Sequence, residues 1–417
     1  MKSSNVTRVA AAAAAAGLLL TGCGSSDDEA TTGAAASSTQ ASNLDTGTFP
    51  TTPQPEFGTP PAEAATLVEG QRMGEFVVLP EEIDPILIDV TRNAARPLKD
   101  FEAAGLGPEA VAPTLEDSFV AGFTTSAGSA KENYARVLGT TVVRFEDADA
   151  ADAARETVTA AMLEFDYQVE YEYDVPVPVF LDPIEGLPNT TVITEEFPPY
   201  GDETENGLTV TAITPHNDYL LVTQMAVPAS SKQWADQSIT TFVEQQVPLI
   251  DQFPATPVEE IPDTTMDQDK VLIYTIPNQD GESSVTFSDM AVYGPRGAGA
   301  VDPHFRRTYQ RMVESNVKHV GIGRTTVYET ASEEDAKNLV DGLVEDNLDV
   351  EGTIVVDPPV GLEEAQCVDV AENIDGKTCW VANGRFVGQA ASDLSDTDPT
   401  EVNQLIAAQY LILDHAK

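Results

Sequence analysis

The chain has 417 residues, with 22 Lys and Arg against 69 Asp and Glu, so its formal net charge is −47 at pH 7. Because nucleic acid attracts proteins through clustered basic residues, this charge excludes nucleic-acid binding. We interpret the acidity as a solvated surface. The densest basic group is expected to serve internal ion pairs; it consists of Arg306, Arg307, Arg311, Lys318 and His319.

The first 22 residues have the three parts of an export signal. Lys2 and Arg8 form a short basic region, an apolar run extends from Val9 to Leu20, and small residues precede Cys23. The apolar run is 12 residues long, shorter than the roughly 20 that a transmembrane helix needs. We therefore predict a cleaved signal peptide over residues 1–22 rather than an uncleaved anchor.

The box Leu20-Thr21-Gly22-Cys23 resembles the signal of bacterial lipoproteins at every position. The resemblance implies a diacylglyceryl group on the Cys23 thiol, cleavage before Cys23, and a new amine open to acylation, with palmitate among the expected chains. Two or three acyl chains anchor a protein firmly, since each buried methylene contributes roughly 0.8 kcal/mol. We expect a protein anchored by lipid in the cell membrane, on its extracytoplasmic face.

Lipidation of Cys23 leaves Cys367 and Cys379 as the remaining cysteines. An exported protein reaches a compartment that permits disulfides, so we predict a disulfide between them. The alternatives are a reactive thiol and a metal site. Eleven residues separate the two cysteines and no His is near, which argues against a metal, and no cofactor is expected.

Residues 23–66 are rich in Ala, Ser, Thr, Gly and Pro, a composition that predicts a disordered tether. The pattern changes after it, where Phe76–Leu79 reads as a strand that Pro80 ends. The rest of the chain has more residues than a single hydrophobic core usually supports, so two domains are predicted, over 67–253 and 268–417. The segment between them carries several prolines among acids.

In the first domain, a strand at 140–145 leads into an acidic, Ala-rich helix start at 146–153. Acids in a first helical turn complement backbone N–H groups that lack partners there. A hairpin over 208–227, with its turn at His216-Asn217-Asp218, then leads into a helix over 231–250.

The second domain repeats this order. A strand at 325–328 leads into an acidic helix start at 329–336, and a hairpin over 378–390 leads into a helix over 399–414. The turn at Asn383-Gly384 is a strong hairpin signal, because both residues tolerate positive φ. We predict an α+β fold of two tandem related domains, each an antiparallel sheet covered by helices on one face.

Motifs of known chemistry are few. Ser315-Asn316-Val317-Lys318 matches the S-x-x-K of penicillin-binding proteins without its partner motifs. The run Gly294–Gly299 is expected to be a mobile connection, since it lacks the lysine of a phosphate loop. An acidic group resembles a calcium loop, but we interpret it as the cap of the last helix; it consists of Asp393, Asp396, Asp398 and Glu401. We assign no catalytic, cofactor-binding or metal residue.

As a whole, the signal, the tether, the segment Gly70–Pro80 and the two-part body resemble a family of uncharacterised lipoproteins from mycolic-acid-containing actinobacteria. More faintly, Cys367–Leu413 is similar to the extracellular sensor domains of some actinobacterial Ser/Thr kinases. These resemblances imply binding of an envelope lipid, glycan or protein without catalysis. The alternatives are an envelope hydrolase with a non-motif active site and a purely structural component.

Overall fold

The computed structural model describes most of the chain from residue 44 onward. The described ranges are 44–90, 95–129, 136–170, 172–199, 204–278, 284–286, 288–302, 305–370, 376–392 and 399–416. The predicted signal peptide and Cys23 lie outside them. Asn43–Lys417 form one compact unit. Within the described ranges, no helix is long and apolar enough to cross a bilayer.

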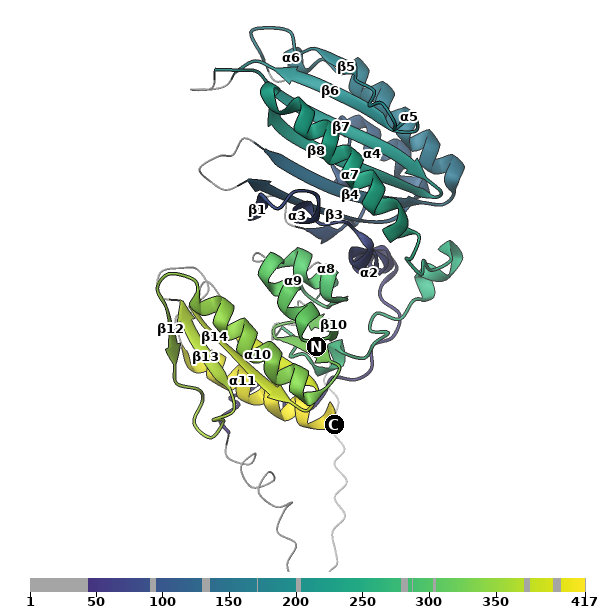
Figure 1. Ribbon diagram of the computed structural model, residues 1–417. Helices are drawn as coiled ribbons and strands as arrows, with labels where there is room; N and C mark the ends of the chain where they lie inside the picture. Colours follow the sequence, from purple (N-terminus) through teal and green to yellow (C-terminus); the bar gives the residue numbers. More distant parts are fainter. Residues whose placement is uncertain are drawn as a thin grey trace, which may run out of the picture. The chain divides into compact units, whose positions relative to one another are not determined.

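The first of two antiparallel sheets, sheet A, belongs to the N-terminal half of the chain (Figure 1). Its described strands are β1 (Leu87–Val90), β2 (Arg96–Pro97), β3 (Phe119–Ser129), β4 (Val137–Phe145), β5 (Val179–Leu181), β6 (Thr191–Phe197), β7 (Gly207–His216) and β8 (Tyr219–Pro228). They pair in the order β1-β3-β4-β8-β7-β6-β5, and β2 pairs with β3.

Sheet B belongs to the C-terminal half. Its described strands are β9 (Ala291–Tyr293), β10 (Val317–Ile322), β11 (Thr326–Thr330), β12 (Thr353–Val356), β13 (Gln366–Val370), β14 (Gly376–Asn383) and β15 (Phe386–Ala391). They pair in the order β12-β13-β14-β15-β11-β10-β9. Cys367 and Cys379 stand opposite each other on β13 and β14 and form a disulfide.

The long helices are α2 (Ala62–Met73), α5 (Ala148–Glu164), α7 (Lys232–Ile250), α9 (Phe305–Glu314), α10 (Glu333–Leu348) and α11 (Pro399–Leu413). Helices α5, α7, α10 and α11 begin at or next to the predicted positions, whereas α2 begins inside the predicted tether and was not predicted. Asp147 Oδ1 accepts a hydrogen bond from the Ala150 backbone N–H at 2.8 Å, and Ser332 Oγ accepts one from Asp335 at 3.1 Å. These side chains satisfy N–H groups that the first helical turn leaves unpaired, which fixes where α5 and α10 begin.

Short helices complete the connections. The α-helical ones are α3 (Pro80–Ile83), α4 (Ala112–Leu115), α6 (Tyr167–Glu170) and α8 (Pro295–Val301). The 3-10 turns are η2 (Gly74–Phe76), η3 (Glu102–Ala104), η4 (Glu109–Val111), η5 (Glu116–Ser118), η7 (Ala229–Ser231), η8 (Val258–Asp263), η9 (Leu272–Tyr274) and η10 (Asp414–Ala416).

The two sheets share one topology. Read from β9, sheet B has the order β9-β10-β11-β15-β14-β13-β12, which matches the order β1-β3-β4-β8-β7-β6-β5 of sheet A; the additional strand β2 has no counterpart among the described strands of sheet B. In both halves β4 or β11 leads into α5 or α10, and the hairpin β7–β8 or β14–β15 leads into α7 or α11. Asn217 and Gly384 take positive φ, 52° and 60°, in the two hairpin turns. The predicted α+β fold of two tandem domains is confirmed, as are the repeat and both hairpins.

Helices cover both faces of sheet A. In β8, Val222 shares a buried cluster with Val158 of α5, whereas Met225 shares another with Ile239 of α7. Residues an odd number of positions apart in a strand point to opposite faces. Therefore α5 and α7 lie on opposite faces of sheet A.

Sheet B is arranged in the same way. Trp380 of β14 packs in a cluster with Leu339 of α10, and its neighbour Cys379 packs in one with Ile406 of α11. The predicted covering of one face only is therefore wrong for both sheets. Strands covered on both faces are continuously buried and lose the apolar alternation that marks a half-exposed sheet. In β4, every residue over 140–145 is buried.

The predicted tether packs against the C-terminal half from residue 44 on. Phe49 is buried in a cluster with Leu405 of α11. The backbone N–H of Gln54 donates to the Ile273 carbonyl at 2.8 Å. Residues 44–66 were expected to be disordered from their composition, and they are ordered instead because a few side chains in this polar stretch find partners far along the chain.

The strand predicted over Phe76–Leu79 is also wrong. Phe76 ends η2, and the residues after it satisfy their backbone groups with side chains rather than with a neighbouring strand. The Val78 N–H donates to Gln246 Oε1 at 2.8 Å, and Thr140 Oγ1 donates to the Val78 carbonyl at 2.8 Å. This buried, hydrogen-bonded segment fixes the residues before it, which carry the candidate site.

Candidate functional site

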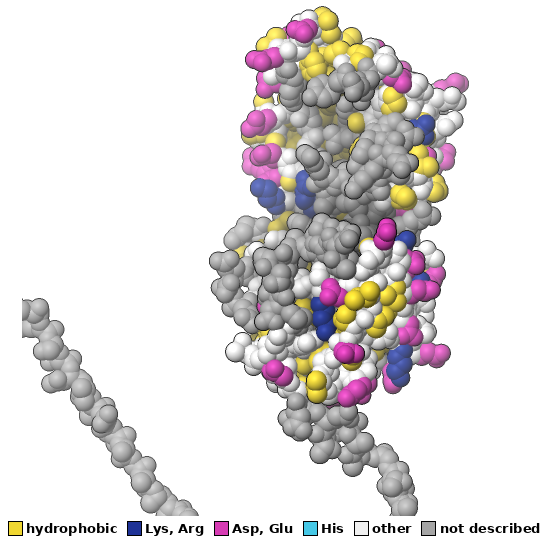
Figure 2. Space-filling view, turned by 90° about the vertical axis from the view of Figure 1, so that its left-hand side faces the viewer, with side chains coloured by type: hydrophobic (Ala, Val, Ile, Leu, Met, Phe, Trp, Pro, Cys, Tyr) yellow, Lys and Arg dark blue, Asp and Glu magenta, His cyan; other side chains and the backbone are white. Residues whose placement is uncertain are grey.

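Two basic residues of the group predicted from sequence, Arg307 and Arg311, form ion pairs. Arg311 Nε lies 3.0 Å from Asp346 Oδ2, and Arg307 Nη1 lies 3.5 Å from Asp349 Oδ2. The Arg306 side chain lies outside the described part of the chain. On the face that Figure 2 shows, acidic side chains outnumber basic ones. The predicted internal pairing is confirmed for Arg307 and Arg311.

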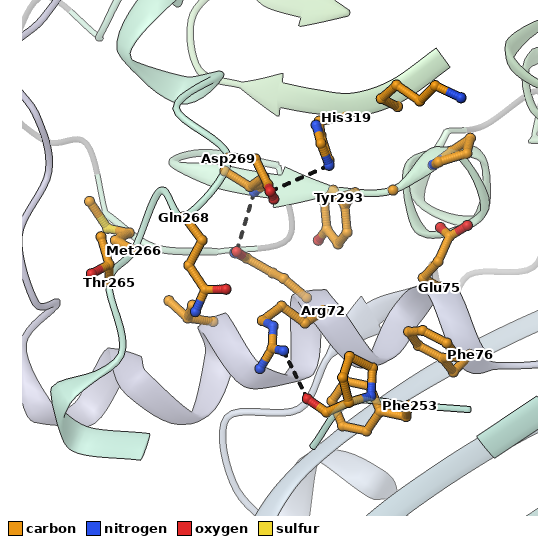
Figure 3. A pocket seen from close by; sticks show the side chains of 17 residues that line it. Arg72, Glu75, Phe76, Phe253, Thr265, Met266, Gln268, Asp269, Tyr293 and His319 are labelled. Carbon is orange, nitrogen blue, oxygen red and sulfur yellow. Dashed lines mark hydrogen bonds and ion pairs between the residues drawn. The ribbon is translucent and has the colours of Figure 1, made fainter. Parts of the chain in front are cut away.

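Lys318 and His319 instead line a cavity of about 320 Å³, which we call the α2 pocket (Figure 3). Helix α2, the segment after α7, and strands β9 and β10 contribute its walls. The apolar part of the lining comprises Val68, Phe76, Phe253, Met266, Val292 and Tyr293. The charged part comprises Arg72, Glu75, Asp269, Lys318 and His319.

His319 connects two carboxylates at the edge of this pocket. Its Nε2 lies 3.4 Å from Asp269 Oδ1, and its Nδ1 lies 2.9 Å from Glu329 Oε2. A neutral imidazole donates a hydrogen bond from only one of its nitrogens. Only the protonated ring can therefore donate to both carboxylates. Lys318 forms no hydrogen bond or ion pair with the described residues, although its charge interacts electrostatically with Asp335. The pocket therefore offers an acceptor at Asp269 and a cation at Lys318.

Glu75 also lines the pocket. Its Oε2 accepts hydrogen bonds from the backbone N–H groups of Arg296 at 2.8 Å and Gly297 at 3.2 Å, at the start of α8. Burial raises the pKa of Glu75, and these backbone hydrogen bonds and Arg296 act against that rise. The Arg296 guanidinium pairs with Glu82. The Glu75 carboxylate is thus already occupied as a helix cap.

The run Gly294–Gly299, expected to be a mobile connection, forms the start of α8 instead. A Cβ at Gly297 would lie 2.9 Å from the Tyr293 ring, and one at Gly299 would lie 2.6 Å from Tyr309 Cβ. Glycine therefore permits close packing here rather than mobility. The tight turn holds Tyr293 against the pocket.

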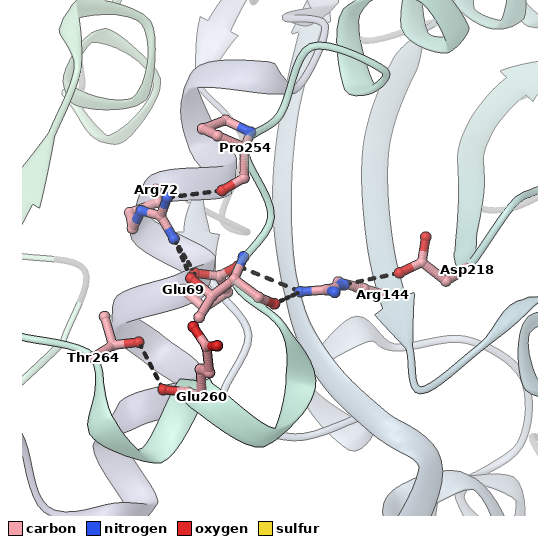
Figure 4. Close-up of polar contacts among 8 residues, drawn as sticks. Glu69, Arg72, Arg144, Asp218, Pro254, Glu260 and Thr264 are labelled. Atoms are coloured by element: carbon pink, nitrogen blue, oxygen red, sulfur yellow. Dashed lines mark hydrogen bonds and ion pairs between the residues drawn. The ribbon is translucent and has the colours of Figure 1, made fainter.

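A buried ion cluster lies behind the pocket (Figure 4). Glu69 of α2 is 0% exposed and pairs with the Arg72 and Arg144 guanidinium groups, the latter at 3.4 Å. Its carboxylate also accepts from the backbone N–H and hydroxyl of Thr256, at 2.9 and 3.0 Å. Arg144 Nε lies 2.9 Å from Asp218 Oδ2 in the β7–β8 turn. We call these five residues the Glu69 cluster.

The Glu69 cluster positions one wall of the pocket. Arg72 donates to the Pro254 carbonyl at 2.9 Å, and Arg144 donates to the Thr256 carbonyl at 2.7 Å. These bonds hold the segment after α7 against α2. Phe253, which directly precedes Pro254, packs with its ring 5.3 Å from that of Phe76 and 5.6 Å from the Arg72 guanidinium carbon.

The other sequence candidates are not brought together. Ser315 is buried, and Lys318, three residues on, is exposed. Glu401 pairs with Arg324 at 2.9 Å, while the run of Asp393, Asp396 and Asp398 lies outside the described residues. His216 Nε2 lies 2.7 Å from Asp251, away from the pocket lining. Within the described residues, no group of three or more His, Cys, Asp or Glu is placed to hold a metal.

Sequence reasoning singled out His319 but not its carboxylate partners. Glu329 lies on the next strand, in the antiparallel pair β10–β11, where His319 and Glu329 are directly opposite. The pairing of β10 with β11 was therefore the signal from which the contact between His319 and Glu329 could have been predicted. Asp269 lies in the Pro-rich segment between the predicted domains. This segment has no periodic apolar pattern from which the direction of a side chain could be predicted.

Comparisons with known proteins give a family and a distant likeness in fold. No functionally curated protein matches the chain. Among solved structures, the extracellular domain of PknH from Mycobacterium tuberculosis is similar at 13% identity and a TM-score of 0.28, over 42% of this chain and 95% of that one. Residues 56–266 match the N-terminal domain of unknown function DUF7373, and residues 269–416 match its C-terminal domain. The chain therefore belongs to the DUF7373 family and contains both of its parts.

Proposed function

We propose that the protein is a lipid-anchored, extracytoplasmic binding protein that takes a small amphipathic ligand into the α2 pocket without chemical change. The observation that carries this proposal is the pocket's division into an apolar part and a charged part. Ligand sites are typically concave and mostly apolar, with a few converging polar groups that orient the ligand. The α2 pocket, at about 320 Å³, is of a size to take a small molecule.

The two sides of the pocket define the ligand's chemistry. Phe76, Phe253 and Met266 offer apolar surface to a hydrocarbon or ring. Lys318 offers a cation that forms no hydrogen bond with the described residues, and Asp269 offers a carboxylate with its His319 contact at 3.4 Å. A ligand with an apolar body and a polar or zwitterionic end would satisfy both sides.

His319 supports binding rather than proton transfer, because both of its nitrogens already face carboxylates. A general base needs a free lone pair within hydrogen-bond reach of the group it activates. The ring is better placed to orient Asp269 than to abstract a proton. A hydrolase remains the rival, and the experiment below distinguishes it.

Native mass spectrometry of the protein released from its own membrane tests the binding proposal. We expect a small molecule to remain bound to the wild type and to His216→Ala, and to be lost from His319→Ala. His216 is a matched control, because it also pairs with an Asp but lies outside the pocket. The absence of any bound molecule in the wild type, or its equal retention in H319A, would refute the proposal. A bound molecule that is converted on incubation would favour the hydrolase.

The anchor is tested separately. Cys23→Ala should leave the precursor uncut and its mature form absent from the membrane fraction, because only a thiol accepts the diacylglyceryl group. The double variant Cys367→Ala/Cys379→Ala is the control and should be processed normally. Mass spectrometry of the N-terminus and membrane fractionation give the readout. Normal maturation of C23A would contradict the anchor and leave the pocket proposal untouched.

A further inference from the structure

Exposed apolar side chains are concentrated in one stretch of the N-terminal half. Of the twelve large hydrophobic residues exposed in the described part of the chain, five lie within 163–182. They are Leu163, Val169, Val175, Phe180 and Leu181. Figure 2 shows apolar side chains gathered over α6 and β5, at the top of the view, with acidic side chains around them. We call these five residues and the acids between them the 163–182 patch.

The charge of the patch is of one sign. Residues 163–182 contain six acids and no Lys or Arg. Five of the acids are exposed and form no ion pair with the described residues: Glu164, Asp166, Glu170, Glu172 and Asp174. The sixth, Asp182, pairs with Lys232. Unpaired carboxylates around apolar side chains offer both halves of a docking surface for a cationic amphipathic segment.

Packed aromatic rings support the patch from beneath. The Tyr167 ring lies 4.7 Å from Phe165 and 5.8 Å from Phe197, and Tyr173 lies 5.7 Å from Phe197. The Tyr167 hydroxyl also donates to the Glu195 carboxylate. Because these contacts fix Tyr167 and Tyr173 against the end of β6, a partner would not have to order these two residues on binding.

The backbone of the patch is unsuited to adding another strand. Among the described strands, β5 is the last of sheet A and pairs on one side only, but it spans three residues and is flanked by Pro178 and Pro183. Prolines beside a short edge strand block pairing by another chain. Docking would therefore occur through side chains.

We propose that the 163–182 patch docks a cationic amphipathic helix of a partner protein. An anionic membrane surface is the wrong counterpart, because the exposed carboxylates would be repelled by its headgroups. The helix would lie along the outer edge of β5, where it would contact Phe180 on one face of the strand and Leu181 on the other. Its Lys or Arg residues would lie beside Glu170, Glu172 and Asp174.

The second half of the repeat supplies a matched control. β12 occupies the position of β5 in the shared topology, and it also exposes apolar residues, Ile354 and Val355. Charges beside it are partly balanced, since Asp349 lies 3.5 Å from Arg307 and Lys377 interacts electrostatically with the carboxylates of Asp357 and Asp369. This edge has comparable apolar exposure with fewer free carboxylates.

The experiment measures binding of a labelled Leu-Lys amphipathic helical peptide to the mature full chain by fluorescence anisotropy. We expect Phe180→Ser/Leu181→Ser to raise the dissociation constant at least about tenfold, the loss expected from two buried apolar side chains. Glu170→Gln/Glu172→Gln/Asp174→Asn should also weaken binding. The dissociation constant of this variant should depend less on salt concentration than that of the wild type. Ile354→Ser/Val355→Ser should change it less than about twofold, since β12 lies outside the proposed surface.

Two outcomes would overturn the proposal. One is that the β12 variant loses as much affinity for the peptide as F180S/L181S does, or that F180S/L181S loses none. Either result would mean that the peptide binds through the general negative charge of the chain. The other is binding of phosphatidylcholine vesicles that F180S/L181S abolishes, which would assign the patch to lipid. Circular dichroism spectra matching the wild type confirm that each variant is folded. The apolar positions are exposed, so their replacement should leave the core unchanged.

Discussion

Removing Arg144 should destabilise the protein by about 3–5 kcal/mol, because it breaks a buried ion cluster and leaves a carboxylate uncompensated. Arg144→Met keeps much of the side-chain volume. It deletes the contact with Glu69 at 3.4 Å, that with Asp218 at 2.9 Å and the hydrogen bond to the Thr256 carbonyl at 2.7 Å. Glu69 is fully buried but keeps Arg72 and Thr256 as partners, which places the expected loss toward the lower end of that range.

Urea unfolding followed by fluorescence and circular dichroism measures this loss, as a fall in the midpoint at unchanged slope. Arg155→Met is the matched control. Arg155 pairs with Asp152 and Glu156 at the surface, where its partners are 53% and 70% exposed. Exposed pairs typically contribute at most about 1 kcal/mol. If R144M and R155M lose stability equally, the reasoning that burial makes the Glu69 cluster important is refuted.

Two further predictions concern Glu75 and the disulfide. Burial raises the pKa of Glu75 above its ordinary value of 4.5, so the folded state binds this proton more tightly and loses stability as pH rises through the folded pKa. Glu75→Gln removes that dependence, and its stability relative to wild type should be more favourable at pH 7 than at pH 4; a relative stability that falls from pH 4 to pH 7 would contradict the assignment. Cys367→Ala/Cys379→Ala opens a loop with a sequence separation of 12 and should lower the free energy of unfolding by about 3 kcal/mol. Reducing agent should destabilise the wild type but leave this variant unchanged.

The repeated core of the fold was readable from sequence because its signals are local. The turn at Asn383-Gly384 and the caps Asp147 and Ser332 each act within a few residues. A hairpin or a helix start therefore needs no knowledge of the rest of the chain. The covering of both sheet faces was not readable, because buried strands such as β4 no longer show alternation.

The candidate site depends on contacts that sequence patterns do not report. Glu69 meets Thr256 across 187 positions, and Val78 has its N–H satisfied by the side chain of Gln246. An apolar run such as Phe76–Leu79 predicts a strand only if its backbone groups find a neighbouring strand. Here side chains from α7 and β4 replace that strand, and the same segment becomes a support for the α2 pocket.

The continuity of the core predicts that the two domains unfold together. One buried cluster contains Val142 and Phe242 from the N-terminal half and Val320 and Trp380 from the C-terminal half. Since both halves lose packing when either opens, a single cooperative transition is expected despite the two sheets.

The chain's two tryptophans allow a direct test, because Trp234 lies in the first domain and Trp380 in the second. In Trp380→Phe the remaining fluorescence follows the N-terminal half, and in Trp234→Phe it follows the C-terminal half. In each variant, the fluorescence curve should coincide with the circular dichroism curve of the whole chain in urea. Fluorescence transitions that separate from circular dichroism in opposite directions would show that the halves unfold independently. The shared cluster would then be a contact surface between two autonomous cores rather than one core.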